Sequence, residues 1–177
     1  MLNYNMTKSR RSFRKKESYK YLANRILSIC EKEKIKILGL TSTNNKCDFQ
    51  NQVLENLYEV FLEKDIKVLV VHAVISAEGD MGENVESANN RCKITTLNNF
   101  TAKQLSSLIK ENESDYDLIL VSVPCVLVWS EALEYAKVCK NLILVEKYMY
   151  SYYKDYKNLL YELENSEVIP RGVVAIK

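Results

Sequence analysis

The 177-residue chain has the length of one ordinary domain, and its 47% hydrophobic and 27% charged residues exclude a disordered, fibrous or coiled-coil protein. The formal net charge is +2, yet residues 1–16 contain six basic side chains and no acidic one, so the rest of the chain is net acidic. An acidic body disfavours nucleic-acid binding, because phosphate contacts need a basic face.

Segment 1–16 is expected to be a flexible basic tail, and residues 17–177 are expected to form a single domain. Such a tail is either a solvated arm without function or a contact for an anionic partner or membrane surface. Peripheral membrane contact through the tail is therefore one prediction for this chain.

Amphipathic helices and apolar strands are predicted to alternate along the chain. Apolar residues at helical spacing predict helices over 17–34, 49–64, 101–113, 130–138 and 150–165. Apolar runs predict strands over 35–43, 68–75, 93–97, 117–123, 141–146 and 172–176. The polar segment 76–91 is predicted to be a loop. This βα alternation predicts an α/β fold with a doubly wound, mainly parallel sheet, helices on both faces, and central strands at 37–40, 68–71, 118–121 and 142–145.

The cysteine pattern and the apolar runs indicate a cytoplasmic protein. The five cysteines are widely spaced without a CxxC pair, so neither a zinc site nor a disulfide scaffold is expected. The first long apolar run, Val68 to Ile75, is far shorter than the ~20 residues that a membrane-spanning helix needs.

Three predicted strand ends, 41–48, 72–76 and 122–126, are candidate ligand-binding segments, because ligands of doubly wound sheets bind beyond the carboxyl ends of strands. His72 is a candidate general base, but a lone histidine ending a buried strand is more often structural. Cys125 superficially resembles a nucleophile, but no histidine follows it in the sequence, which favours a buried small side chain.

The segment Ile35 to Phe61, IKILGLTSTNNKCDFQNQVLENLYEVF, resembles the first strand, loop and helix of the kinase domain of bacterial capsular and exopolysaccharide tyrosine kinases. These BY-kinases are P-loop proteins of the deviant Walker group. KVLVVHAVI at 67–75 and DYDLILVSVPCV at 115–126 resemble their next two motif strands, and the likeness extends from about residue 17 to the end. The resemblance implies a P-loop NTPase-type fold, an ATP and Mg²⁺ site, and a role in envelope polysaccharide biosynthesis.

The motif residues themselves do not carry over. A P-loop needs glycines whose backbone N–H groups wrap phosphates, a lysine to neutralise them, and a serine or threonine for Mg²⁺. The loop 42–50 has no glycine, and the lysine position of the family falls on Phe49 or Gln50. His72 stands where the family has an aspartate after the second strand, and Ser122 replaces the Walker B aspartate. The predicted degenerate nucleotide site comprises Ser42, Lys46, Asp48, Phe49, Gln50, His72 and Ser122.

Loss of all these groups predicts a catalytically inactive relative, or pseudokinase, with no catalytic residue, metal or cofactor of its own. In the alternative, Lys46 shifts in the loop and Asp48 holds Mg²⁺, so that the chain remains a nucleotide-binding ATPase or kinase with a non-standard site. A third possibility is an unrelated small ligand at the same strand ends.

Six tyrosines between 148 and 161 are similar to the cluster that BY-kinases phosphorylate on themselves, although here the cluster falls on a predicted helix of the fold. We expect instead an aromatic helix face for packing or association, with Tyr150, Tyr153 and Tyr156 as a candidate interaction surface. The expected partners are a second copy, an active kinase paralogue or a membrane regulator of polysaccharide chain length. Ring assembly of the family kind is in doubt, because the charged residues near Glu17 are out of register.

Overall fold

A seven-stranded sheet forms the centre of the computed structural model, which describes residues 2–44, 49–75, 82–87 and 92–176. The strand order is β3-β4-β2-β5-β1-β6-β7. Six strands are parallel, and β3 alone pairs antiparallel, with β4. The strands are β1 (Ile37–Thr41), β2 (Val68–Val74), β3 (Gly82–Ser87), β4 (Cys92–Asn98), β5 (Leu118–Ser122), β6 (Asn141–Lys147) and β7 (Ile169–Ile176). The predicted mainly parallel sheet and its central strands are confirmed.

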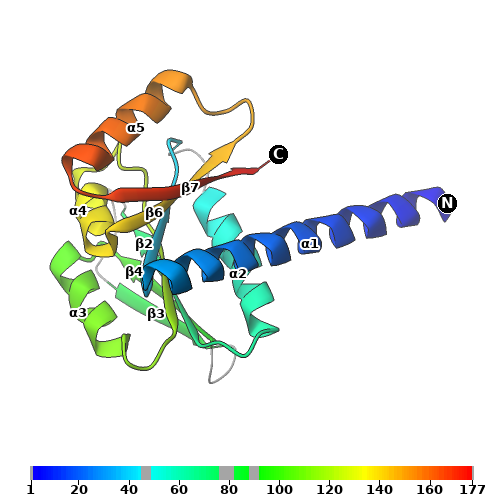
Figure 1. Cartoon of the computed structure of the whole chain (residues 1–177), viewed down its shortest axis with the longest axis horizontal. Helices are drawn as coiled ribbons and strands as arrows, with labels where there is room; N and C mark the ends of the chain where they lie inside the picture. Colours follow the sequence, from blue (N-terminus) through cyan, green and yellow to red (C-terminus); the bar gives the residue numbers. More distant parts are fainter. Residues whose placement is uncertain (1, 45–48, 76–81, 88–91, 177) are drawn as a thin grey trace.

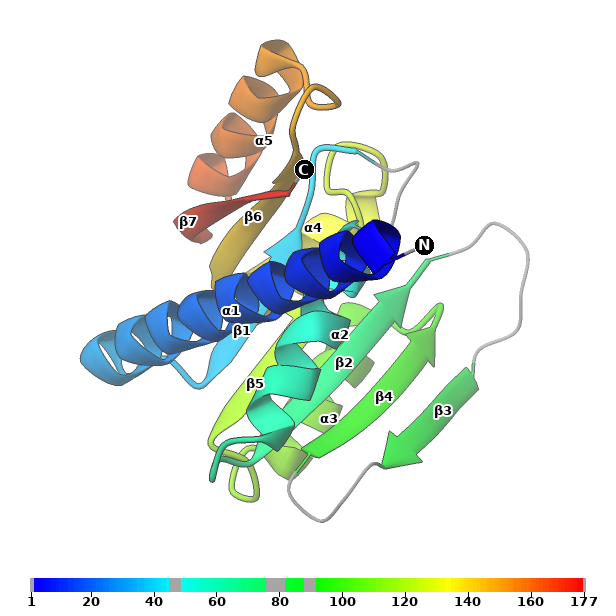
Figure 2. The same ribbon diagram turned by 90° about the vertical axis from the view of Figure 1, so that its right-hand side faces the viewer.

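Helices cover both faces of the sheet (Figures 1 and 2). They are α1 (Leu2–Glu33), α2 (Phe49–Leu62), α3 (Ala102–Asn112), α4 (Ser130–Cys139) and α5 (Tyr153–Asn165). One hydrophobic core packs α1 and α2 against the sheet, and a second core packs α3, α4 and α5 against the other face. The fold is therefore doubly wound, as expected.

The central strand β5 shows why the sheet forms. All five of its residues are buried. Leu118 and Leu120 belong to the core under α1 and α2, whereas Ile119 and Val121 belong to the opposite core. Because side chains alternate between the two faces of a strand, only a continuous apolar run can fill both cores.

Helix α1 is longer than predicted. Residues 2–16, expected as a flexible tail, are helical and continuous with the rest of α1. Residues 2–33 contain no glycine or proline, so nothing in the sequence interrupts the helix. The helix ends before Lys34, which has a φ of 55° and lets the chain turn into β1. Among the described residues, no helix combines the length and hydropathy of a membrane span.

Two further predictions were wrong in detail. The segment 76–91 is not only a loop, because it contains β3; this edge strand is mostly polar and lacks the apolar alternation that indicates a buried strand. Helix α5 begins at Tyr153 rather than at residue 150, because Met149, with a φ of 65°, directs the chain into a turn.

Replacement of Leu120 by alanine should lower the free energy of unfolding by about 2–5 kcal/mol, because this fully buried side chain would leave a cavity in the central strand. Urea denaturation measures the loss. Val128→Ala, at a side chain that is 47% exposed, is the control and should change stability by less than about 0.5 kcal/mol. Equal losses in the two variants would contradict the assignment of β5 to the core.

Candidate functional site

The carboxyl ends of β1, β2, β5 and β6 lie at one edge of the sheet, beside the start of α2. In β2 and β5, His72 and Ser122 are register partners, which places their side chains next to each other. Asn51 of α2 joins them, because its Oδ1 accepts a hydrogen bond from Ser122 Oγ and lies 3.1 Å from His72 Nδ1. Helix α2 is thus tied to two strand ends through one amide oxygen.

Gln50 and the loop after β1 also contact each other. Gln50 is buried, and its Oε1 lies 3.3 Å from Ser42 Oγ. Ser42 Oγ donates a hydrogen bond of 2.8 Å to the carbonyl of Asn44. The Gln50 side chain therefore turns back onto the loop instead of reaching into an open site.

A buried carboxylate lies against this loop. Glu146, near the end of β6, is only 9% exposed. It accepts hydrogen bonds from Thr43 N–H at 3.1 Å, from Thr43 Oγ1 at 2.7 Å, and from Ser151 Oγ. Backbone N–H groups of a P-loop bind phosphate. Here the N–H of Thr43 binds a carboxylate of the chain itself.

Aromatic rings cover the start of α2. Phe49, the first residue of the helix, meets the Tyr150 ring edge-on at a centroid distance of 6.4 Å. The ammonium of Lys147 lies 5.1 Å from the Phe49 centroid and 4.5 Å from that of Tyr150. The segment after β6 therefore packs over the helix end that holds phosphate in P-loop proteins.

The Cys125 thiol is buried, and burial raises its pKa above the usual value. Its Sγ lies 3.4 Å from the carbonyl of Thr43. A buried thiol that stays protonated is a poor nucleophile, so Cys125 acts as the expected small packing residue next to the loop.

The structure brings together five of the predicted site residues, namely Ser42, Phe49, Gln50, His72 and Ser122. Lys46 and Asp48 lie outside the described residues, so the geometry bears only on the remaining positions.

Sequence reasoning missed Asn51, Thr43, Glu146 and Ser151. Asn51 follows Gln50 as serine or threonine follows lysine in the P-loop motif, and this spacing could have identified it. Glu146 is 103 positions from Thr43, and no local pattern in the sequence marks that contact.

These residues do not fit a Mg²⁺ nucleotide. The side chains joined at the strand ends are an amide, a hydroxyl and an imidazole, whereas Mg²⁺ prefers carboxylate and hydroxyl oxygens with bound water. Within the described part of the chain, no group of three or more His, Cys, Asp or Glu side chains could hold a metal ion. The Glu146 carboxylate at the loop would repel phosphate.

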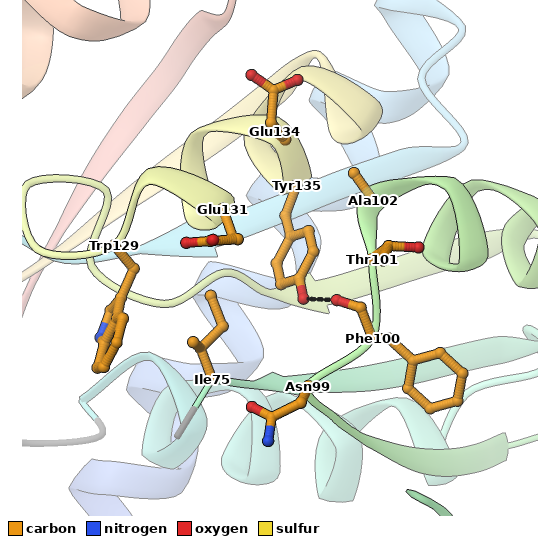
Figure 3. Close-up of a pocket in the computed structure, with 9 residues that line it drawn as sticks. All are labelled: Ile75, Asn99, Phe100, Thr101, Ala102, Trp129, Glu131, Glu134 and Tyr135. Carbon is orange, nitrogen blue, oxygen red and sulfur yellow. Dashed lines mark hydrogen bonds between the residues drawn. The ribbon is translucent and has the colours of Figure 1, made fainter. Parts of the chain in front are cut away.

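A separate hollow of about 460 Å³ lies between the start of α3 and α4, past the ends of β2 and β4 (Figure 3). The Tyr135 ring forms part of its wall, and the Tyr135 hydroxyl donates a hydrogen bond to the carbonyl of Phe100. Two carboxylates, Glu131 and Glu134, line the hollow, and its described lining contains no basic side chain. A hydrogen bond from the Glu131 backbone N–H, and then one from the Ser130 hydroxyl, lower the pKa of Glu131, so the hollow does not suit an anion.

Comparisons with known proteins give structural likeness without sequence likeness. No protein-family model matches the chain, and a search of curated proteins finds no match. The kinase domain of VpsO superposes with a TM-score of 0.68 at 15% identity, over 94% of this chain and 97% of that chain. The kinase domain of the Escherichia coli tyrosine kinase ETK gives 0.63 at 17% identity, over 79% of this chain and 66% of that one.

A ParA family ATPase from Chlorobium tepidum is also similar, with a TM-score of 0.55 at 16% identity over 80% of this chain and 73% of that chain. At sequence identities of 15–17%, these superpositions show that the chain shares the fold of these proteins, and nothing more. The chain has the P-loop NTPase-type α/β fold of bacterial tyrosine kinase domains.

Proposed function

We propose that this chain is a catalytically inactive relative of the capsular polysaccharide tyrosine kinases, a regulatory or scaffolding module of envelope polysaccharide biosynthesis in the cytoplasm. The observation that carries the proposal is the buried Glu146 carboxylate, which accepts hydrogen bonds from the Thr43 N–H and hydroxyl at the start of the loop that corresponds to the P-loop. The motif resemblance described in the sequence analysis, together with the shared fold, supports the choice of the polysaccharide pathway.

The contacts of Asn51 support the loss of the metal site. In the P-loop motif, the residue after the lysine binds Mg²⁺ beside the Walker B aspartate. Asn51 bonds to Ser122, the residue in place of that aspartate, which favours Gln50 over Phe49 as the residue at the lysine position. An amide, a hydroxyl and an imidazole carry no negative charge with which to hold a dication.

Electrostatics gives the consequence for catalysis. Phosphoryl transfer depends on positioning and on cations that neutralise the transferred group, and a single such cation can contribute about 10³-fold or more in rate. Here the lysine position holds a neutral side chain, and among the described residues a buried carboxylate, Glu146, contacts the start of the loop. The remaining function is then binding, to a protein partner or at the inner membrane surface.

Purified full-length protein should show no heat of binding with MgATP or MgADP in isothermal titration calorimetry, and no ATPase or tyrosine autokinase activity. An active kinase domain of the same fold is the positive control. Turnover that Lys46→Ala or Asp48→Ala abolishes would contradict the proposal and support the alternative, a nucleotide enzyme with a non-standard site.

Replacement of Glu146 by glutamine should lower the free energy of unfolding by about 1–3 kcal/mol, because an amide has one acceptor oxygen for two buried donors and one half-buried donor. Chemical denaturation measures the change. The matched control is Glu134→Gln, at an exposed carboxylate paired with Lys137, which should lose less than about 1 kcal/mol. Unchanged stability of Glu146→Gln would show that the loop is not held by this carboxylate.

A further inference from the structure

Large apolar and aromatic side chains are exposed between β6 and α5. In residues 147–154, here called the aromatic loop, five such side chains are between 56% and 86% exposed. They are Tyr148, Met149, Tyr150, Tyr152 and Tyr153. They account for half of the exposed large hydrophobic side chains among the described residues. Monomeric proteins rarely expose such a group unless it contacts something.

The backbone of the aromatic loop is anchored at several points. Tyr148 N–H donates to the carbonyl of Ile176 at the end of β7, at 2.8 Å. Tyr150 N–H donates to the carbonyl of Lys147 at 3.1 Å, and Ser151 Oγ donates to the buried Glu146. The backbone of the loop is thus held in place while Tyr148, Tyr152 and Tyr153 stay largely exposed, and little backbone entropy is left to lose on binding.

Lysines lie among these rings. The ammonium of Lys147 is 4.5 Å from the Tyr150 ring centroid, and that of Lys157 is 5.6 Å from the Tyr153 centroid. Lys154 is exposed between them in the sequence. In the described structure none of the three forms an ion pair, whereas Lys20 and Lys137 each pair with a glutamate. The aromatic loop and the adjoining first turn of α5 therefore carry three lysines against one acidic residue, Asp155, on an otherwise acidic body.

A second cationic segment lies at the same end of the molecule. The first half of α1 projects beyond the sheet on the side of the strand carboxyl ends, where the aromatic loop and the end of β7 also lie (Figures 1 and 2). The sequence of residues 8–16 contains six basic residues, of which Lys16 pairs with Glu63, the residue that follows α2.

This chemistry fits the surface of an anionic bilayer. Tyrosine and lysine both carry an apolar body and a polar tip, which suits them to the headgroup layer of a membrane. The centres of protein interfaces, in contrast, are depleted in lysine. We propose that the aromatic loop is a lipid-binding surface that docks on anionic phospholipid headgroups, with the first half of α1 adding electrostatic attraction. This inference goes beyond the proposed function and does not depend on whether nucleotide binds.

Co-sedimentation of the full chain with phosphatidylcholine vesicles, with and without phosphatidylglycerol, tests the inference. Wild-type protein should bind only the anionic vesicles, and salt should weaken the binding. A Tyr148→Ser, Met149→Ser, Tyr152→Ser variant should bind at least about tenfold more weakly, because it removes apolar area from the headgroup layer. The control variant Tyr21→Ser, Val128→Ser, Tyr161→Ser changes side chains of comparable exposure elsewhere and should bind within about twofold of wild type.

Charge is tested with a second pair of variants. Lys154→Gln, Lys157→Gln should weaken vesicle binding by about 25-fold, since each lysine near an anionic membrane contributes about fivefold. Lys20→Gln, Lys137→Gln makes the same change in net charge away from the aromatic loop and α5, and it should have a much smaller effect. Circular dichroism and the melting temperature verify that all four variants are folded.

Three results would overturn the inference. The first is equal binding to neutral and anionic vesicles, or no binding to either. The second is an equal loss of vesicle binding in the loop variants and in their control variants, which would assign the contact to α1 alone. The third is oligomer formation without lipid, seen by light scattering and abolished by the loop substitutions, which would make the loop an interface between proteins.

Discussion

The burial of β5 on both faces is the constraint from which the rest of the structure follows. With β1 on one side and β2 on the other, β5 fills two cores at once, so its parallel register is strongly specified. Parallel register makes neighbouring strands end at the same edge of the sheet. Ser122 and His72 meet there because of the register, and the start of α2 then brings Asn51 against both.

A loop that follows the first strand of a P-loop fold has backbone N–H groups directed to the site, and buried N–H groups need acceptors. Bound phosphate is the acceptor in nucleotide-binding proteins. In this chain Glu146 accepts the N–H and the hydroxyl of Thr43, so the chain itself supplies the acceptor at the described start of the loop. The contact of Glu146 with Thr43 therefore satisfies a donor at the start of the loop without phosphate, and it supports the proposed absence of nucleotide binding.

The Glu146 carboxylate also links the start of the loop after β1 to the aromatic loop. Glu146 binds Thr43 on one side and Ser151, within the aromatic loop, on the other. Tyr150 and Lys147 extend this link, because both pack against Phe49 at the start of α2. The contacts that cover the start of α2 therefore also hold the aromatic loop in its outward-facing position, so a change in one is expected to affect the other.

The sequence alone was sufficient for the α/β class, the parallel sheet and its four central strands, because apolar periodicity and burial obey local rules. It also predicted Ser42, Phe49, Gln50, His72 and Ser122, which the structure brings together, since motif spacing is local too. It did not predict β3, whose polar residues belong to an edge strand, or the contact of Glu146 with Thr43, which lie 103 positions apart. Tyr156 illustrates the same limit: it packs against the second core instead of joining the exposed surface of Tyr150 and Tyr153. Which residues meet across the fold, and which rings stay outside, depends on packing between elements, and only the tertiary structure decides that.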